Sequence, residues 1–304
     1  MTRISLQTPA KVNLCLRVLG RRDDGYHNVE TVLHTIGLWD RVSLSRLPEP
    51  GRIELQVEGE PAPADDTNLC WRAAARLAER ARTGAGVRIA LCKTIPVGAG
   101  LGGASSDAAA TLLGLTRLWN LALTQDELEG VGGQVGADVP FFLRRGCCLA
   151  RGRGERLQDL PPLAAWLVVV VPARRVATAQ AYAALQRGAS RGRRRALTRP
   201  AQRMTAALQE GRLAVVAAAL HNDFEALRIA GIEDALQAAA ALREAGCLGA
   251  SVSGSGSGVF GLAPGRAEAE RVASEMGAVW PWVRAVPTLR REESLLMSEV
   301  EEAS

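Results

Sequence analysis

The chain of 304 residues has little of what a metal centre or a membrane anchor requires. It contains three histidines, and its six cysteines are scattered through apolar segments without the spacing of a metal site. Such cysteines are expected to be buried and reduced. No apolar run reaches the roughly 18 residues of a membrane-spanning helix, and the first residues lack the long apolar core of a signal peptide. We expect a cytoplasmic protein with no membrane partner.

Lysine is also rare, because 35 of the 37 basic residues are arginine. Lysine carries a compact, mobile charge, whereas arginine presents a wide planar fork. In a chain so biased toward arginine, a remaining lysine can mark a site where arginine cannot serve, or it can be accidental. The two lysines are Lys11, near the N-terminus, and Lys93, just before a glycine-rich segment.

Aromatic residues are missing from the densest basic segment, residues 187–199, which contains six arginines. Nucleic-acid sites usually combine basic residues with aromatic platforms or a basic helical face. We therefore expect a solvated connector there, with no nucleic-acid partner.

Hydrophobic patterns predict strands and helices along the whole chain. In the first half, the predicted strands are 12–18, 29–38, 42–47, 53–57 and 87–92, the predicted helices are 68–82 and 105–118, and 147–158 is a predicted hairpin. In the second half, strands are predicted at 166–171, 250–252, 259–262 and 282–287, and helices at 201–208, 213–220, 232–244 and 267–276. Asn68 is a predicted helix N-cap, and residues 299–304 are predicted to be disordered.

Pro161-Pro162 is the best candidate for a linker. The order of the predicted elements indicates two α+β domains, residues 1–160 and 161–304, with a cleft between them.

The segment 95–110, IPVGAGLGGASSDAAA, holds four glycines and two serines within nine residues and then continues as an alanine-rich helix. Backbone N–H groups at a helix N-terminus bind phosphate well, because the helix dipole adds positive charge there. The predicted phosphate-binding residues are Pro96, Val97, Gly98, Ala99, Gly100, Leu101, Gly102, Gly103, Ala104, Ser105 and Ser106.

Three known glycine loops do not match this segment. A Walker P-loop would end in Gly-Lys-Ser/Thr, which is missing here. A dinucleotide fingerprint needs a strand that leads directly into the first glycine, whereas residues 93–96 intervene, and the next acids, Asp126 and Glu127, follow Thr124 in a helix-capping box. The strand and loop motifs of protein kinases are also missing. An ordinary glycine-rich turn before a helix is the other interpretation.

Three further polar clusters are candidates for chemistry: Lys11 with Asn13, the sequence DDGYH at 23–27, and Asp138 in GADVPFF. A carboxylate beside both apolar surface and a lysine is an arrangement that can tune a general base. Alternatively, Asp138 could cap a turn before Pro140.

Four segments occur in the order found in the GHMP kinases, and the similarity covers nearly the whole chain: PAKVNLCLRVLGRRDDGYHNVET, IPVGAGLGGASSDAAATL, GADVPFF and SGSGSGVFG. The chain therefore resembles this family. The glycine segment is typical of the family as a whole, whereas PAKVNL and DGYH indicate a member that acts on a cytidine diphosphate-linked alcohol. Two positions differ from the family pattern: Ala104 replaces a common glycine, and Gly258 replaces a frequent cysteine.

The resemblance implies a fold and an activity. The fold is a two-domain α+β structure, with a ribosomal-protein-S5-like N-terminal domain, an α/β sandwich C-terminal domain and the active-site cleft between them. The activity is phosphorylation of a small alcohol by ATP with Mg²⁺, without an obligate protein partner. A protein catalyses phosphoryl transfer mainly by positioning the reactants and by stabilising charge.

By the same resemblance, residues take roles at the reacting group and at ATP. Asp138 would accept the hydroxyl proton, while Lys11 would keep Asp138 ionised and neutralise charge on the transferred phosphoryl group. The glycine segment would hold the ATP phosphates, with Ser106 helping to bind Mg²⁺. Asn68 and Lys93 would line the adenine pocket.

The second substrate would be bound by a separate set of residues. Asn13 would lie beside its hydroxyls, His27 would read the cytosine edge, and Tyr26 and Tyr182 would stack on the two faces of the base. Thr178 would contact the ribose or phosphate side.

Two other functions remain open at this point. Another small-molecule GHMP kinase, of the homoserine or mevalonate type, would keep the glycine segment but would not need the Tyr26-His27 pair. An RNA-binding protein of related topology would use the arginine segment, and its affinity for RNA would depend steeply on salt.

Overall fold

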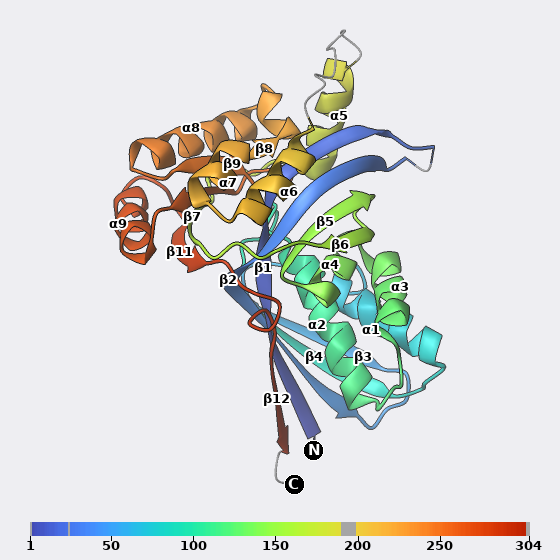
Figure 1. Ribbon diagram of the computed structural model, residues 1–304. Coiled ribbons are helices and arrows are strands. Elements are labelled where there is room, and N and C mark those ends of the chain that lie inside the picture. The colour runs from blue at the N-terminus through green and yellow to red at the C-terminus, as the bar shows by residue number, and fades with distance from the viewer. Residues whose placement is uncertain (1, 24, 190–198, 302–304) are drawn as a thin grey trace.

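The computed structural model describes residues 2–23, 25–189 and 199–301. Most of the arginine-rich segment lies outside these residues. Within them, the strands form an eight-stranded and a four-stranded sheet (Figure 1). The larger sheet has the order β12-β1-β2-β4-β3, with β5 on β2, β6 on β5 and β8 on β1. The smaller sheet has the order β11-β7-β10-β9.

The first half of the chain supplies most of the larger sheet and the helices that cover it. Its strands are β1 (Thr2–Arg21), β2 (His27–Leu47), β3 (Ile53–Gly59), β4 (Gly86–Lys93), β5 (Cys147–Gly152) and β6 (Arg156–Asp159). Its helices are α1 (Leu69–Ala81), α2 (Gly103–Leu118), α3 (Gln125–Val135) and α4 (Val139–Arg144).

The second half supplies the smaller sheet and the remaining elements. Its strands are β7 (Trp166–Val170), β8 (His221–Asn222), β9 (Gly249–Val252), β10 (Val259–Ala263), β11 (Val283–Pro287) and β12 (Leu296–Glu301). Its helices are α5 (Thr178–Ala189), α6 (Pro200–Glu210), α7 (Leu213–Ala219), α8 (Ala230–Glu244) and α9 (Arg266–Gly277), with a short 3₁₀ helix, η1 (Asp223–Ala226).

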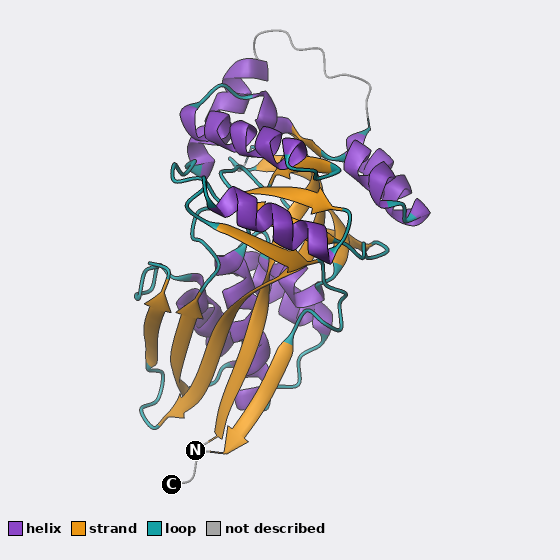
Figure 2. Cartoon of the chain, turned by 90° about the vertical axis from the view of Figure 1, so that its left-hand side faces the viewer, coloured by secondary structure: helices purple, strands orange, loops and turns teal. Residues whose placement is uncertain are grey.

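The helices of the first half pack on one face of the larger sheet, behind the strands in Figure 2. Helix α2 lies close to the sheet because Gly114 has no side chain: a Cβ there would lie 2.4 Å from Leu44 Cδ1 and 2.8 Å from Leu6 Cδ1. This close packing places the N-terminus of α2 against β1, which carries Lys11.

The predicted helices and strands are largely confirmed, with differences in β1, β2 and the C-terminal residues. Strand β1 begins at Thr2, whereas the predicted strand began at residue 12. Residues 27–47 form the single long strand β2, where the sequence patterns predicted two strands, because β2 pairs with β1 along its whole length, from Ser45 opposite Arg3 to His27 opposite Arg21. The hydrophobic residues of GADVPFF form the short helix α4.

The prediction of a disordered tail at 299–304 is wrong for the residues described there. Residues 296–301 form β12, which pairs antiparallel with β1 from Leu296 opposite Gln7 to Glu301 opposite Thr2. Strand β8 also joins this sheet, parallel to β1. Both strands come from the second half of the chain, and the predicted domain boundary after residue 160 stays a prediction.

His34 ties β2 to the segment that connects the two halves. Its side chain is fully buried, with Nε2 accepting a hydrogen bond from Leu163 N at 2.9 Å and Nδ1 lying 2.9 Å from Thr35 O. A neutral ring with its proton on Nδ1 satisfies both partners. Burial lowers the pKa of His34 from 6.5 to about 4, against the raising effect of the bond to Thr35.

We expect stability to fall as the pH falls from 6.5 to 4, because the unfolded chain binds a proton at His34 that the folded chain resists. The expected loss is about 3 kcal/mol of unfolding free energy. Urea unfolding of the wild type and of His34→Gln across this range measures it, and the variant should lose this part of the pH dependence. The control His221→Gln should keep this pH dependence. If the unfolding free energy of His34→Gln fell with pH as steeply as that of the wild type, the assignment of the effect to His34 would be wrong.

Candidate active site

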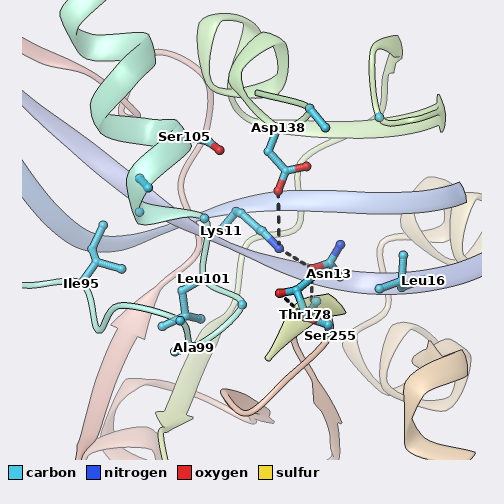
Figure 3. A pocket seen from close by; sticks show the side chains of 18 of the residues that line it. Lys11, Asn13, Leu16, Ile95, Ala99, Leu101, Ser105, Asp138, Thr178 and Ser255 are labelled. Atoms are coloured by element: carbon cyan, nitrogen blue, oxygen red, sulfur yellow. Dashed lines mark hydrogen bonds and ion pairs between the residues drawn. The ribbon is translucent and has the colours of Figure 1, made fainter. Parts of the chain in front are cut away.

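A cavity of about 330 Å³ brings together most of the predicted site residues. Its walls come from β1, β2, the glycine segment, the start of α4, the turn between β5 and β6, helix α5 and the loop between β9 and β10. The predicted residues that line it are Lys11, Asn13, Lys93, Pro96, Val97, Gly98, Ala99, Gly100, Leu101, Gly102, Gly103, Ala104, Ser105, Asp138, Thr178 and Tyr182. Segments far apart in the sequence therefore form a single site (Figure 3).

The glycine segment needs its glycines for both conformation and space. Gly98, Gly100 and Gly102 have φ angles of 72°, 74° and 77°, which residues with a Cβ rarely adopt. A Cβ at Gly102 would also lie 2.9 Å from Lys11 Cγ. Gly102 is the N-cap of α2, so the loop leads directly into the positive end of that helix. The loop can hold phosphate where it faces the cavity.

The second glycine-rich loop, residues 253–258, braces the first one. Gly258 N donates to Ala99 O at 2.9 Å, and Ser253 Oγ donates to Gly100 O at 2.9 Å. A Cβ at Gly258 would lie 2.4 Å from Ala99 O. The glycine at this position therefore lets the two loops touch.

Lys11 and Asp138 face each other across the cavity (Figure 3), with Lys11 Nζ 4.0 Å from Asp138 Oδ2. Lys11 is buried, and burial lowers its pKa, while the charge of Asp138 opposes that shift. Asp138 keeps 36% of its side chain exposed. It stands at the N-cap position of α4 but makes no capping hydrogen bond. Its carboxylate is therefore available for chemistry.

Asn13 holds Lys11 in place. Its Oδ1 accepts from Lys11 Nζ at 2.6 Å and from Gly254 N at 2.8 Å. Its Nδ2 donates to Thr31 Oγ1 at 2.8 Å. The side chain lines the cavity, but its hydrogen bonds join Lys11, β2 and the second glycine loop, so positioning is its evident task.

Of the predicted cytosine-binding residues, Tyr182 lines the cavity, and His27 lies against it. The rings of His27 and Tyr182 lie 4.6 Å apart, and Phe224 meets Tyr182 edge to face at 4.9 Å. Burial, with a smaller effect of Asp138, raises the pKa of Tyr182 to about 12, so it stays protonated. Because His27 already contacts Tyr182, a base that stacks between these two rings must separate them.

Arg153 and Gln186 contact the predicted cytosine-binding residues, and sequence reasoning missed both. The Arg153 guanidinium lies 4.4 Å from the centre of the Tyr26 ring, and Arg153 lines the cavity. Gln186 Nε2 lies 2.7 Å from His27 Nε2. Among 35 arginines, no pattern distinguishes Arg153. Gln186 follows Tyr182 by four residues on α5, a spacing that places both on one helical face.

Four predicted site residues do not line the cavity: Tyr26, His27, Asn68 and Ser106. Ser106 is fully buried, and its hydroxyl donates to Pro9 O at 2.6 Å, so it ties α2 to β1 outside the cavity. Ser105, one residue earlier, lines the cavity instead. Asn68 caps α1, since its Oδ1 accepts from Cys70 N at 2.9 Å and its Nδ2 donates to Pro63 O at 2.7 Å. Its predicted capping role is confirmed, and it does not line the cavity. The predicted site roles of Ser106 and Asn68 stay predictions.

Lys93 lines the cavity, but its ammonium is already engaged. Nζ donates at 2.6 Å to Asp40 Oδ2 and at 2.6 Å to Asp107 Oδ2. The Lys93 side chain is 3% exposed. The two carboxylates therefore use two of its three N–H donors, which leaves one for a contact with adenine.

Comparison with known proteins identifies the family. Residues 68–146 match the GHMP kinases N terminal domain, and residues 204–281 match the GHMP kinases C terminal domain. The 4-diphosphocytidyl-2-C-methyl-D-erythritol kinase of Moorella thermoacetica is 42% identical over 290 residues, covering 95% of this chain and all of that protein. The chain belongs to the GHMP kinases, in the family of 4-diphosphocytidyl-2-C-methyl-D-erythritol kinases.

Solved structures agree with this GHMP kinase assignment. A crystal structure of 4-(cytidine 5'-diphospho)-2C-methyl-D-erythritol kinase has a TM-score of 0.76 and 37% identity, and the match covers 95% of this chain and 99% of that one. A homoserine kinase from Cytophaga hutchinsonii has a TM-score of 0.75 at 20% identity, covering 97% of both chains. The second match shows the fold alone. As a GHMP kinase, the chain is a phosphotransferase, and the family and fold predicted from the four sequence segments are confirmed.

Within the described residues, no helix is both long and apolar enough to cross a membrane.

Proposed function

We propose that this GHMP kinase transfers the γ-phosphoryl group of ATP to the 2-hydroxyl of 4-diphosphocytidyl-2-C-methyl-D-erythritol, a step of the non-mevalonate route to isopentenyl diphosphate. The observation that carries the proposal is the placement of Lys11 Nζ 4.0 Å from Asp138 Oδ2 in a cavity walled by the glycine loop. Relatives at 42% and 43% identity carry the name of this kinase.

The geometry supports an in-line transfer. Backbone N–H groups of the glycine loop hold the ATP phosphates, and the positive end of α2 adds to their attraction. Asp138 accepts the proton of the hydroxyl, whose oxygen forms a bond to the γ-phosphorus while the bond to the β-phosphate oxygen breaks and ADP leaves. Lys11 stabilises the negative charge on the transferred group.

Mg²⁺ fits the donor set of this cavity. The Ser105 hydroxyl and the Asp138 carboxylate are oxygen donors, the type that Mg²⁺ prefers, and both line the cavity. Bound with ATP, Mg²⁺ neutralises phosphate charge. We propose Ser105 in place of Ser106 as the serine that would help to hold it.

The cytidine end of the substrate would be bound by Tyr26, His27 and Tyr182, with Thr178 near the ribose or phosphate side. Thr178 Oγ1 lies 3.0 Å from Ser255 Oγ, and both residues line the cavity. Burial and, to a smaller degree, Arg21 lower the pKa of His27, so a neutral imidazole reads the base. We also propose that Arg153 supplies a positive charge beside the substrate diphosphate. Its guanidinium lies over the ring of Tyr26, which would contact the base, and Arg153 lines the cavity.

Thermal shift assays test the choice of substrate class. CDP and CMP should raise the unfolding temperature, and homoserine should not. Stabilisation by homoserine without any effect of cytidine nucleotides would instead favour a homoserine-type GHMP kinase. ATP consumption that depends on the diphosphocytidyl substrate, followed by detection of its 2-phosphate, tests the reaction itself. A cytoplasmic location and the absence of nucleic-acid and obligate protein partners stay predictions.

Tyr26→Ala is expected to raise KM for the cytidine substrate about 5- to 100-fold with kcat changed less than about threefold, because stacking contributes about 1–3 kcal/mol per base. Tyr26→Phe should keep most of the affinity, since it keeps the ring. The control is Trp282→Ala, which removes a similar ring 5.2 Å below Arg284 in the second half. Unchanged KM in Tyr26→Ala would contradict the stacking role.

A further inference from the structure

Three buried ionisable side chains lie beneath the start of the glycine loop. They are Lys93 at the end of β4, Asp40 on β2 and Asp107 in α2, and their side chains are 3%, 0% and 1% exposed. Lys93 Nζ lies 2.6 Å from one oxygen of each carboxylate. Two buried carboxylates share one ammonium, so their contacts decide which one carries the negative charge.

Asp40 has hydrogen-bond donors on both of its oxygens. Oδ2 accepts from Lys93, while Oδ1 accepts from the backbone of Thr94 at 2.5 Å and of Ile95 at 2.8 Å. These two residues lead from β4 to Pro96 and the glycine loop. An ionised carboxylate is an acceptor on both oxygens, which is what this arrangement requires.

Asp107 has a different environment. Its Oδ2 accepts from Lys93, but its buried Oδ1 has no hydrogen-bond partner among the described residues. Burial raises the pKa of Asp107 well above its usual range, and Lys93 opposes this shift. We take Asp40 as the ionised partner of Lys93 and Asp107 as the neutral acid. A neutral Asp107 also leaves the positive end of α2 available for phosphate.

The carboxylate of Asp40 controls both ends of the loop. Before the loop, it accepts hydrogen bonds from the N–H groups of residues 94 and 95. At the end of the loop, Gly103 is the first residue of α2. A Cβ there would lie 3.0 Å from Ile95 Cγ2 and 3.3 Å from Asp40 Oδ2, so Gly103 packs directly on the Asp40 carboxylate, which we call the anchor. A shift of the anchor therefore moves the N–H groups that face the cavity.

We propose that Asp40, paired with Lys93, is a positioning residue that fixes the glycine loop for the ATP phosphates. The inference rests on the proposed function, because it takes this loop as the ATP site. It reassigns Lys93 from adenine contact to loop support. Asp40 acts through the backbone and touches neither substrate.

Asp40→Asn and Asp107→Asn form a matched pair of variants. An amide offers an acceptor on only one side, so Asn at position 40 satisfies either Lys93 or the two backbone N–H groups but not both. Asn at position 107 keeps an acceptor for Lys93, and its NH2 group takes the place of Oδ1, which has no hydrogen-bond partner among the described residues of the wild type. The same chemical change is therefore expected to have unequal effects.

Calorimetric binding of ADP and the two KM values test the proposal. Asp40→Asn should weaken ADP binding and raise KM for ATP about 10- to 100-fold, the scale of a small misplacement of binding groups. In Asp40→Asn, KM for the cytidine substrate should change less than about threefold. The loss of ADP affinity in Asp107→Asn should be smaller than the loss in Asp40→Asn by at least about fivefold. Unfolding curves of each variant accompany these measurements.

Equal effects of the two variants, or unchanged ADP affinity in Asp40→Asn, would overturn the proposal. If Asp40→Asn does not fold, Asp40→Glu replaces it, because glutamate keeps the charge but displaces the carboxylate. In that variant too, KM for ATP must rise while KM for the cytidine substrate changes little. A wild-type protein that does not bind ADP would refute the proposed function instead, so the two failures are distinguishable.

Discussion

Asp138→Asn is expected to lower kcat about 10²- to 10⁴-fold, the contribution of a positioned general base. The amide has the same shape but cannot accept the hydroxyl proton. KM for the cytidine substrate should change little, because the proposed contact of Asp138 is with the reacting hydroxyl and not with the predicted base site. Steady-state kinetics with both substrates measures the effect.

In this test, the effect on catalysis can be separated from an effect on stability. Asp138 makes no capping bond to α4, and its ion-pair partner is 4.0 Å away, so the replacement should cost little stability. Asp234→Asn is a suitable control, because it removes a surface carboxylate that lies 3.6 Å from Arg174 Nε. A kcat within about threefold of wild type would refute the general-base role, since a base should matter by at least about 10².

Lys11→Arg is expected to lower kcat by about 10² or more, although the charge is conserved. The Lys11 stem passes Gly102, where a Cβ would lie 2.9 Å from Lys11 Cγ, and its ammonium fits beside Asn13 Oδ1 at 2.6 Å. The wide planar guanidinium does not fit in that space. Single-turnover measurements of phosphoryl transfer test this directly.

Lys11→Met separates shape from charge. It keeps the length of the stem and removes the ammonium, so it should fold normally and lose activity at least as severely as Lys11→Arg. Because burial lowers the pKa of Lys11, we also expect the wild-type rate to fall on the alkaline side below pH 10.5, as the ammonium loses its proton. Full activity of Lys11→Arg would show that the scarcity of lysine in this chain carries no functional meaning.

Local patterns predicted the local structure well. The Thr124 capping box begins α3, and Asn68 caps α1, because a cap depends on residues within one helical turn. The glycine loop is likewise a local device, since positive φ angles and a following helix are properties of a short segment. These features could therefore be predicted without knowledge of the fold.

Side-chain partners were harder to predict. Ser105 and Ser106 are adjacent and chemically identical, yet one lines the cavity and the other is buried against β1. Only the rotation of α2 on the sheet distinguishes them. In the same way, the sequence distinguishes Lys93 as a rare residue near the loop, but only the packing of β2 and α2 shows the two carboxylates that engage it.

By itself, the sequence determined the family, the order of the elements and the glycine loop, and it predicted Lys11 and Asp138 as the reacting pair. The tertiary structure decided which of these groups meet. Asn13 joins Gly254 across 241 positions, and β12 joins β1 across nearly the whole chain. Periodicity and motif spacing describe neighbours along the chain, whereas contacts between distant segments depend on how the sheets and helices pack. The cavity and the Asp40 anchor beneath the glycine loop arise from that packing.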